Sequence, residues 1–84
     1  MSVDEQTILR EAVVIISDLF GVDAVALSFE TTRASIPEWD SLQHMNLVLD
    51  VERHFQIRLA EEQIASILCV RDLVNAIQTA ASSR

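Results

Sequence analysis

The 84-residue sequence has no lysine and no tyrosine, and it contains one cysteine, one glycine and one proline. The single cysteine, Cys69, excludes an intrachain disulfide framework and fits a reducing compartment. Glycine and proline build most turns, so their scarcity argues against an all-β or loop-rich chain. Because half of the residues are nevertheless hydrophobic and only 5% are aromatic, the composition predicts an all-α fold.

The sequence also lacks a long apolar run. No stretch approaches the ~18 apolar residues that a membrane span requires. The first residues, 1–5, carry neither the basic region nor the apolar stretch of a signal peptide. We therefore expect a cytoplasmic protein without a membrane span.

The chain is acidic: it has thirteen acidic residues and six basic ones, all arginine, for a formal net charge of -7. Such a surface repels phosphate backbones, so nucleic acid is not an expected ligand. It favours a partner protein with a basic patch. One thiol and two histidines do not indicate a metal site.

Hydrophobic spacing predicts four helices, of which the third is short. The predicted segments are about residues 3–20, 41–55, 61–67 and 70–81. Ser2 and Glu5 form a capping-box pattern at the start of the first segment, and Gly21 supplies its stop. A chain of this length makes one domain, so residues 1–84 are expected to form a single four-helix bundle.

A long segment, residues 22–39, connects the first two predicted helices without a sustained period. Spaced apolar residues are expected to pin this loop to the core: Val25, Leu27, Phe29 and Ile36. Pro37 biases the residue before it toward an extended conformation. Connections this long are uncommon in compact domains and are often functional.

The loop ends at Trp39-Asp40-Ser41-Leu42, where the most regular amphipathic segment begins. Asp40 is a preferred N-cap, and Gln43 stands where it can return the bond in a capping box. Ser41 then becomes the first helical residue, at the positive end of a helix dipole that favours a bound phosphate by roughly 0.3–1 kcal/mol. The competing interpretation is a small polar residue in a first helical turn. Trp39 is expected to anchor the loop.

The second helix has two apolar stripes. One contains His44, Leu47, Val48, Val51 and Phe55 and is expected to face the core. The other contains Leu42, Met45 and Leu49, which point away from the first. A small bundle cannot bury both, so the second stripe predicts a partly exposed protein-docking surface beside Ser41. The alternative is a neighbouring loop that covers it.

Asp40, Ser41 and His44 are the residue types of a hydrolytic triad, but the pattern opposes that chemistry. A nucleophile elbow needs a Gly-x-Ser-x-Gly turn after a strand, and neither is present. His44 is predicted on the core side of the same helix as a packing residue. His54 is expected to be an ordinary surface histidine that lacks partners for metal binding or acid–base work, and Cys69 a small buried residue. We therefore predict a protein without catalytic activity of its own.

The tripeptide Asp40-Ser41-Leu42, opening the second of four helices, resembles the signature of acyl carrier proteins. The similarity covers nearly the whole chain and includes Ile57 and Leu59 before a Glu-rich helix, and Val70-Arg71-Asp72-Leu73 at the start of the last. The resemblance implies that a separate phosphopantetheinyl transferase attaches phosphopantetheine covalently to Ser41, and that the thiol of this arm holds acyl groups as thioesters.

The resemblance also implies a set of partners and the residues that meet them. The expected partners are that transferase, a ligase that loads an acyl or aminoacyl group, and downstream transferases or synthases; the chain is expected to be a monomer. The expected recognition residues are Asp40, Leu42, Met45, Leu49 and Glu52.

Several positions depart from the family pattern. Fatty-acid carriers usually present several carboxylates along this helix, whereas Gln43, Asn46 and Arg53 stand here at neighbouring or partner-facing positions, which argues against a generic fatty-acid partner set. Trp39-Asp40-Ser41-Leu42, preceded by Ile36-Pro37-Glu38, more closely resembles the free-standing carriers of specialised pathways. Cys69 stands where the last helix usually has a Ser or Thr cap, a change that costs about 1 kcal/mol and is expected to loosen the adjacent loop. Two alternatives stay open: an aminoacyl or peptidyl carrier, and a helical interaction module without a prosthetic group.

Overall fold

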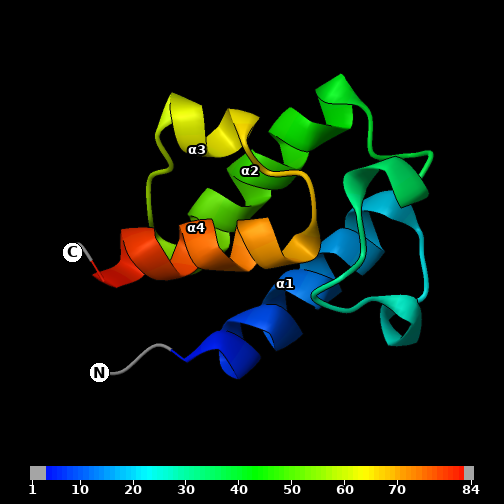
Figure 1. The fold of residues 1–84 in the computed structure, drawn as a ribbon, viewed down its shortest axis with the longest axis horizontal. Helices are drawn as coiled ribbons and strands as arrows, with labels where there is room; N and C mark the ends of the chain where they lie inside the picture. Colours follow the sequence, from blue (N-terminus) through cyan, green and yellow to red (C-terminus); the bar gives the residue numbers. More distant parts are fainter. Residues whose placement is uncertain (1–3, 83–84) are drawn as a thin grey trace.

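The computed structural model describes residues 4–82, and it confirms an all-α fold with four α-helices. The elements, in chain order, are α1 (Glu5–Phe20), the 3-10 turns η1 (Ala24–Ala26) and η2 (Arg33–Ser35), α2 (Ser41–Phe55), α3 (Glu61–Ala65) and α4 (Val70–Ser82). Helices α1, α2 and α4 pack against one another, and the short α3 lies on the opposite side of α4 from α1 (Figure 1).

The ends of α1 follow from its sequence. Asp4 is the N-cap, and its carboxylate accepts the Thr7 backbone N–H at 2.9 Å, which lowers the pKa of Asp4 below its ordinary value. The predicted cap residue Ser2 lies outside the described residues. Gly21 ends the helix at φ 70°, the left-handed conformation that glycine adopts without steric cost. The predicted stop at Gly21 is confirmed.

The core lies where α1, α2 and α4 meet. Its largest fully buried side chains are Ile8, Ile16, Leu47, Val48, Val51, Ile67, Val70, Leu73, Val74 and Ile77. The interhelical loop adds Ile36 and Trp39, both buried. The predicted core stripe of the second helix is confirmed at His44, Leu47, Val48 and Val51, whereas Phe55 is only partly buried.

One loop residue contradicts the expectation that the apolar residues of residues 22–39 pin it to the core. Val25 is 91% exposed, whereas Leu27 and Phe29 pack partly against the core. Val25 belongs to η1, and its backbone N–H is held by the Asp23 carboxylate at 3.0 Å. This local cap fixes a tight turn that leaves the Val25 side chain outside.

The same loop closes the N-terminal end of α4. The backbone N–H groups of Val70 and Arg71 donate to the carbonyls of Thr31 (2.9 Å) and Phe29 (3.0 Å). The first donors of a helix have no partner within it, so these carbonyls act as its cap. The expectation of a loosened loop beside Cys69 is therefore wrong, because main-chain carbonyls replace the missing Ser or Thr cap.

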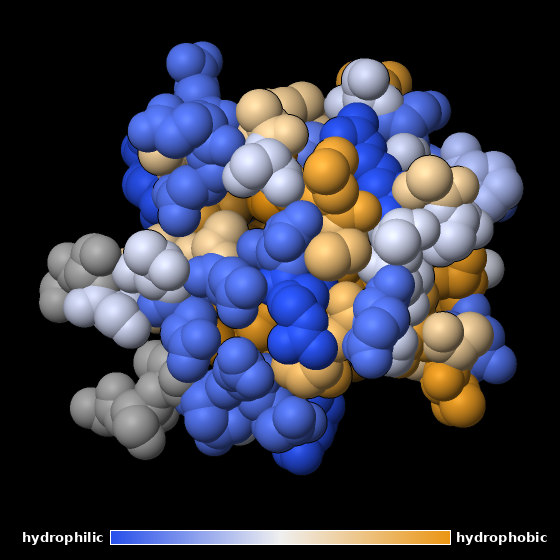
Figure 2. All heavy atoms as spheres, in the orientation of Figure 1, coloured by the Kyte–Doolittle hydropathy of each residue, from blue (hydrophilic) through white to orange (hydrophobic). Residues whose placement is uncertain are grey.

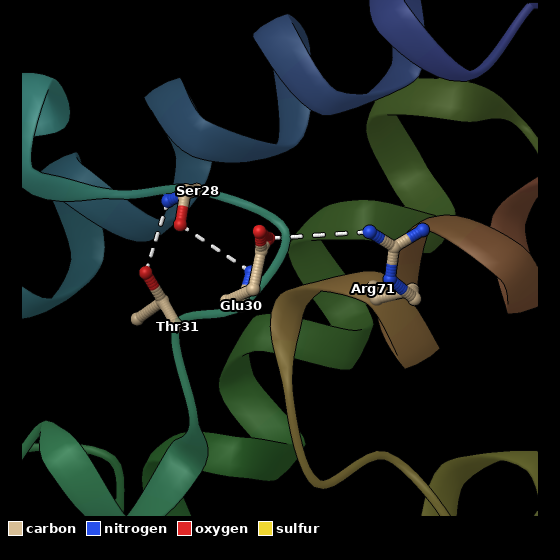
Figure 3. A network of polar contacts seen from close by, with 4 residues as sticks. All are labelled: Ser28, Glu30, Thr31 and Arg71. Carbon is tan, nitrogen blue, oxygen red and sulfur yellow. Dashed lines mark hydrogen bonds and ion pairs between the residues drawn. The ribbon is translucent and has the colours of Figure 1, made fainter.

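Side chains strengthen this junction (Figure 3). The Thr31 hydroxyl accepts the Ser28 backbone N–H at 2.9 Å, and the Ser28 hydroxyl accepts the Glu30 N–H at 3.3 Å. Glu30 in turn lies 3.9 Å from the Arg71 guanidinium, whose carbon stands 4.6 Å above the Phe29 ring. The loop is thus tied to α4 by contacts between residues that are about 40 positions apart in the chain.

Two properties of the described helices and side chains bear on function. Within residues 4–82, none of the helices has the length and apolar character needed to cross a bilayer. The same part of the chain has no cluster of three side chains suited to hold a metal ion.

Candidate functional site

The start of α2 is fixed by Asp40. Its backbone is extended at φ -94°, its side chain accepts the Gln43 N–H at 2.9 Å, and its carbonyl accepts the His44 N–H at 2.8 Å. The predicted N-cap is confirmed. The predicted return bond from Gln43 is not formed in the described part of the chain, because the Gln43 side-chain oxygen instead accepts the Asn46 amide at 2.7 Å.

Replacing Asp40 by alanine removes the acceptor for the Gln43 N–H, so we expect a loss of about 1 kcal/mol in the free energy of unfolding. Asp40→Asn keeps an acceptor and should lie within a few tenths of a kcal/mol of wild type. Urea unfolding followed by circular dichroism measures both. Equal stability of Asp40→Ala and wild type would show that the cap is unimportant.

Behind this cap, Trp39 and His44 form a buried polar contact. The indole N–H can only donate, and it lies 2.9 Å from His44 Nδ1, so Nδ1 must be an acceptor. His44 Nε2 therefore carries the proton and donates to the Ile64 carbonyl at 2.9 Å. The Trp39 ring also packs on Phe20 with centroids 5.5 Å apart. One imidazole thus joins the loop, α2 and the C-terminal part of α3.

This arrangement removes His44 from any role beside Ser41. Both of its nitrogens already have partners, and the residue is buried. A triad requires a hydrogen bond between nucleophile and base, and none joins Ser41 to His44 among the described residues. The predicted packing role of His44 is confirmed.

Ser41 itself is exposed, and its hydroxyl has no hydrogen-bond partner within residues 4–82. It is the first residue of a 15-residue helix. The N-terminus of such a helix favours negative charge through its unpaired N–H groups and its dipole. An exposed, unactivated hydroxyl at this position fits a phosphodiester, because no hydrogen bond of the Ser41 hydroxyl within residues 4–82 would have to break to admit one.

The second apolar stripe of α2 is exposed, as predicted. Leu42 is 73% exposed, Met45 45% and Leu49 50%, so none of the loops covers them. At offsets of three and seven residues they share one face of the helix. Together they form an apolar surface that begins next to Ser41.

Glu52, the fifth predicted recognition residue, has a different environment. Its carboxylate accepts the Leu59 backbone N–H at 2.8 Å, and the residue is half-buried. Eleven residues of helix separate it from Ser41, a rise of about 16 Å. The Glu52 carboxylate therefore supports the α2–α3 connection, while its position three residues after Leu49 continues the face of the stripe.

One polar pair was not foreseen. His54 Nε2 lies 2.6 Å from the Glu11 carboxylate and links α2 to α1. His54 is exposed, so the predicted surface histidine is confirmed, although its contact with Glu11 was not predicted. The two residues are 43 positions apart, and no spacing rule connects them.

Comparisons with known proteins agree with this geometry. The chain matches none of the family models. It is 31% identical over 64 residues to the acyl carrier protein of Clostridium acetobutylicum, a match that covers 76% of this chain and 83% of that protein.

Solved structures of two further relatives superpose on the fold. The solution NMR structure of holo acyl carrier protein from Geobacter metallireducens has a TM-score of 0.80 at 31% identity, covering 89% of this chain and 86% of that one. The crystal structure of acyl carrier protein from Thermotoga maritima has a TM-score of 0.81 at 25% identity, covering 94% and 92%. On sequence and fold together, the chain belongs to the acyl carrier protein family.

Proposed function

We propose that this chain is a non-catalytic carrier in which Ser41 bears phosphopantetheine and presents acyl thioesters to the enzymes of a specialised biosynthetic pathway. The observation that carries the proposal is the exposed Ser41 hydroxyl, without a partner among residues 4–82, at the first position of α2. The Geobacter metallireducens relative, solved in its holo form, supports it.

The attachment is a phosphoryl transfer performed by another enzyme. The Ser41 oxygen forms a new bond to the phosphorus that carries the pantetheine group of coenzyme A, the diphosphate P–O bond breaks, and adenosine 3′,5′-bisphosphate leaves. The transferase must take the serine proton, because His44 has both nitrogens engaged elsewhere. When bound, the arm supplies a thiol that holds the acyl group as a thioester.

In this proposal the residues of the chain itself position the Ser41 hydroxyl. Asp40 sets the first turn of α2, and the buried Trp39–His44 contact fixes the loop that precedes it. The helix dipole favours the negative charge of the phosphodiester. Ser41 is thus presented at a rigid helix end on an otherwise open surface.

The apolar stripe of Leu42, Met45 and Leu49 is the surface that we assign to partner enzymes. Exposed apolar side chains beside a polar rim are typical of protein docking sites, and Met adapts to several partners. Because the stripe begins one residue after Ser41, an enzyme bound to it would have the arm within its reach.

Replacing Leu49 by glutamate is expected to lower the rate of arm transfer by about tenfold, since one lost apolar contact of this kind is worth roughly 1.4 kcal/mol. The matched control is Val14→Glu, because Val14 on α1 is 53% exposed and Leu49 is 50% exposed. Initial rates with a phosphopantetheinyl transferase at subsaturating carrier measure both variants. Equal rates for the two variants would contradict docking on this stripe.

Intact-mass measurement tests the proposed function. After incubation with coenzyme A and a broad-specificity phosphopantetheinyl transferase, the chain should gain the mass of one arm. With an acyl-coenzyme A in place of coenzyme A, hydroxylamine should remove the acyl group and leave the arm, as expected of a thioester. A chain that gains no mass would instead be an interaction module without a prosthetic group.

A further inference from the structure

A groove lies between the loop before α2 and the segment before α4. It is lined by Thr32, Arg33, Ala34, Trp39 and Leu68 and has a volume of about 610 Å³. Figure 2 shows hydrophobic surface on this face of the molecule, where η2 and the segment preceding α4 lie side by side in Figure 1. The groove is separate from the exposed stripe of α2, with which it shares no residue.

The groove is preformed by hydrogen bonds between its two sides. The Arg33 backbone N–H donates to the Leu68 carbonyl at 2.8 Å, and Thr32 and Cys69 form an isolated antiparallel bridge. Trp39 is buried, whereas Leu68 is 63% exposed. A buried indole and an exposed leucine on a fixed frame make an apolar surface that needs no rearrangement to receive an apolar ligand.

Arg33 distinguishes this groove from the rest of the surface. Among the arginines within residues 4–82, Arg33 alone is half-buried, and the others are exposed: Arg10, Arg53, Arg58 and Arg71. Its guanidinium makes no hydrogen bond or ion pair in that part of the chain. A half-buried arginine without a hydrogen-bond or ion-pair partner in the described part of the chain is an unusual arrangement in a protein of net charge -7. An anionic ligand group at this position would be favoured.

The groove also lies close to the attachment serine. Trp39 precedes Ser41 by two residues, so their Cα atoms are at most about 7 Å apart. A flexible arm on Ser41 can therefore fold back over Trp39. If Ser41 bears the arm proposed above, the cargo of that arm is a ligand tethered beside this groove.

We propose that the groove receives the acyl group of the loaded arm, and that the cargo is an acyl chain with an apolar body and a distal carboxylate that pairs with Arg33. This inference rests on the function proposed above and names its substrate class. The apolar body would contact Trp39 and Leu68. No covalent bond changes in the groove, which only shelters and orients the thioester. An aminoacyl cargo is disfavoured, because it has no distal carboxylate to pair with Arg33 and its ammonium group has the same charge as the guanidinium.

Two cargoes of equal chain length test the proposal. A broad-specificity transferase supplied with adipoyl- or hexanoyl-coenzyme A would place arms on Ser41 that differ in one distal carboxylate. The adipoyl arm should shift the NMR signals of the Trp39 indole N–H and the Arg33 Nε–H more than the hexanoyl arm does. Its thioester should also be cleaved by hydroxylamine about tenfold more slowly, the scale of one charge-assisted hydrogen bond.

Variants separate the groove from general effects of charge. Arg33→Gln should give the two cargoes equal NMR shifts and equal cleavage rates. Leu68→Ser should raise the rate at which hydroxylamine cleaves both thioesters. Arg58→Gln, which removes an exposed arginine outside the groove, should leave the difference unchanged. These substitutions alter surface or half-buried side chains, so the circular dichroism spectrum should stay that of the wild type.

The outcomes distinguish the two proposals. If neither cargo is attached to wild type, the proposed carrier function fails. If both are attached but show equal shifts and equal cleavage rates, the function stands and the groove assignment is overturned. If hydroxylamine cleaved an alanyl thioester on the arm more slowly than the adipoyl thioester, the assignment of the cargo class would be overturned.

Discussion

Ser41→Ala is expected to abolish attachment of the phosphopantetheine arm completely while leaving the fold intact. The reaction needs the serine oxygen, so no residual attachment at this position is possible. The fold should not respond, because the Ser41 hydroxyl makes no hydrogen bond within residues 4–82 and alanine is a good first-turn helix residue. Surface substitutions of this kind usually change the free energy of unfolding by less than about 0.5 kcal/mol.

Intact mass and a thermal melt, measured on the same sample, check both parts of this prediction. Ser66→Ala is the control, since Ser66 is exposed and ends α3, where its hydroxyl donates to the Gln63 carbonyl at 3.0 Å. It should gain one arm as wild type does. An arm on Ser41→Ala would place the modification at another residue.

Trp39→Ala is expected to have the largest effect on stability, a loss of about 3–5 kcal/mol in the free energy of unfolding. The indole is buried, packs against Phe20 with ring centroids 5.5 Å apart, and holds the loop that leads into Asp40. Its removal also leaves Nδ1 of the buried His44 without its donor. A loss of this size is a large share of the 5–15 kcal/mol typical of a domain.

Trp39→Phe separates packing from hydrogen bonding. It keeps most of the apolar ring and removes the donor to His44, so we expect a loss of about 1–3 kcal/mol, the range for a buried polar atom left without a partner. Urea denaturation at fixed pH measures both variants. Trp39→Phe as stable as wild type would show that the indole N–H contributes nothing, and a small loss for Trp39→Ala would contradict the role of Trp39 as the anchor of the loop.

The helix ends could be predicted where a single residue type determines them. Asp40 and Gly21 mark a start and a stop through the chemistry of their own side chains, and both positions agree with the structure. The end of α2 also agrees with the prediction, although it has no glycine: Gln56 takes the left-handed conformation at φ 56°. Apolar spacing alone indicated that end.

Contacts made by backbone groups could not be predicted. The carbonyls of Phe29 and Thr31 cap α4, and the Ile64 carbonyl accepts a hydrogen bond from His44 Nε2–H. Every residue has a carbonyl, so no residue type signals which one will be used. The expected loosening of the loop beside Cys69 was wrong for this reason. A side-chain cap can be recognised from its residue type, whereas a cap formed by the backbone carbonyls of a distant loop cannot.

The same distinction between local and distant contacts applies to the candidate site. Ser41, its cap and the exposed stripe follow from the order of residues on one helix, because neighbours on a helix are fixed by local geometry. The groove beside them combines residues of two segments, Arg33 and Leu68, that are 35 positions apart. Only the folded chain brings them together, so the inference about the cargo depends on the structure.

The most direct test of the central claim is to locate the arm within the chain. The wild-type protein is modified with coenzyme A and a phosphopantetheinyl transferase, digested, and the modified peptide is fragmented in a mass spectrometer. We predict that the added mass lies on Ser41 and on no other residue. An unmodified peptide containing Ser41, or an arm on a different serine, would contradict the account.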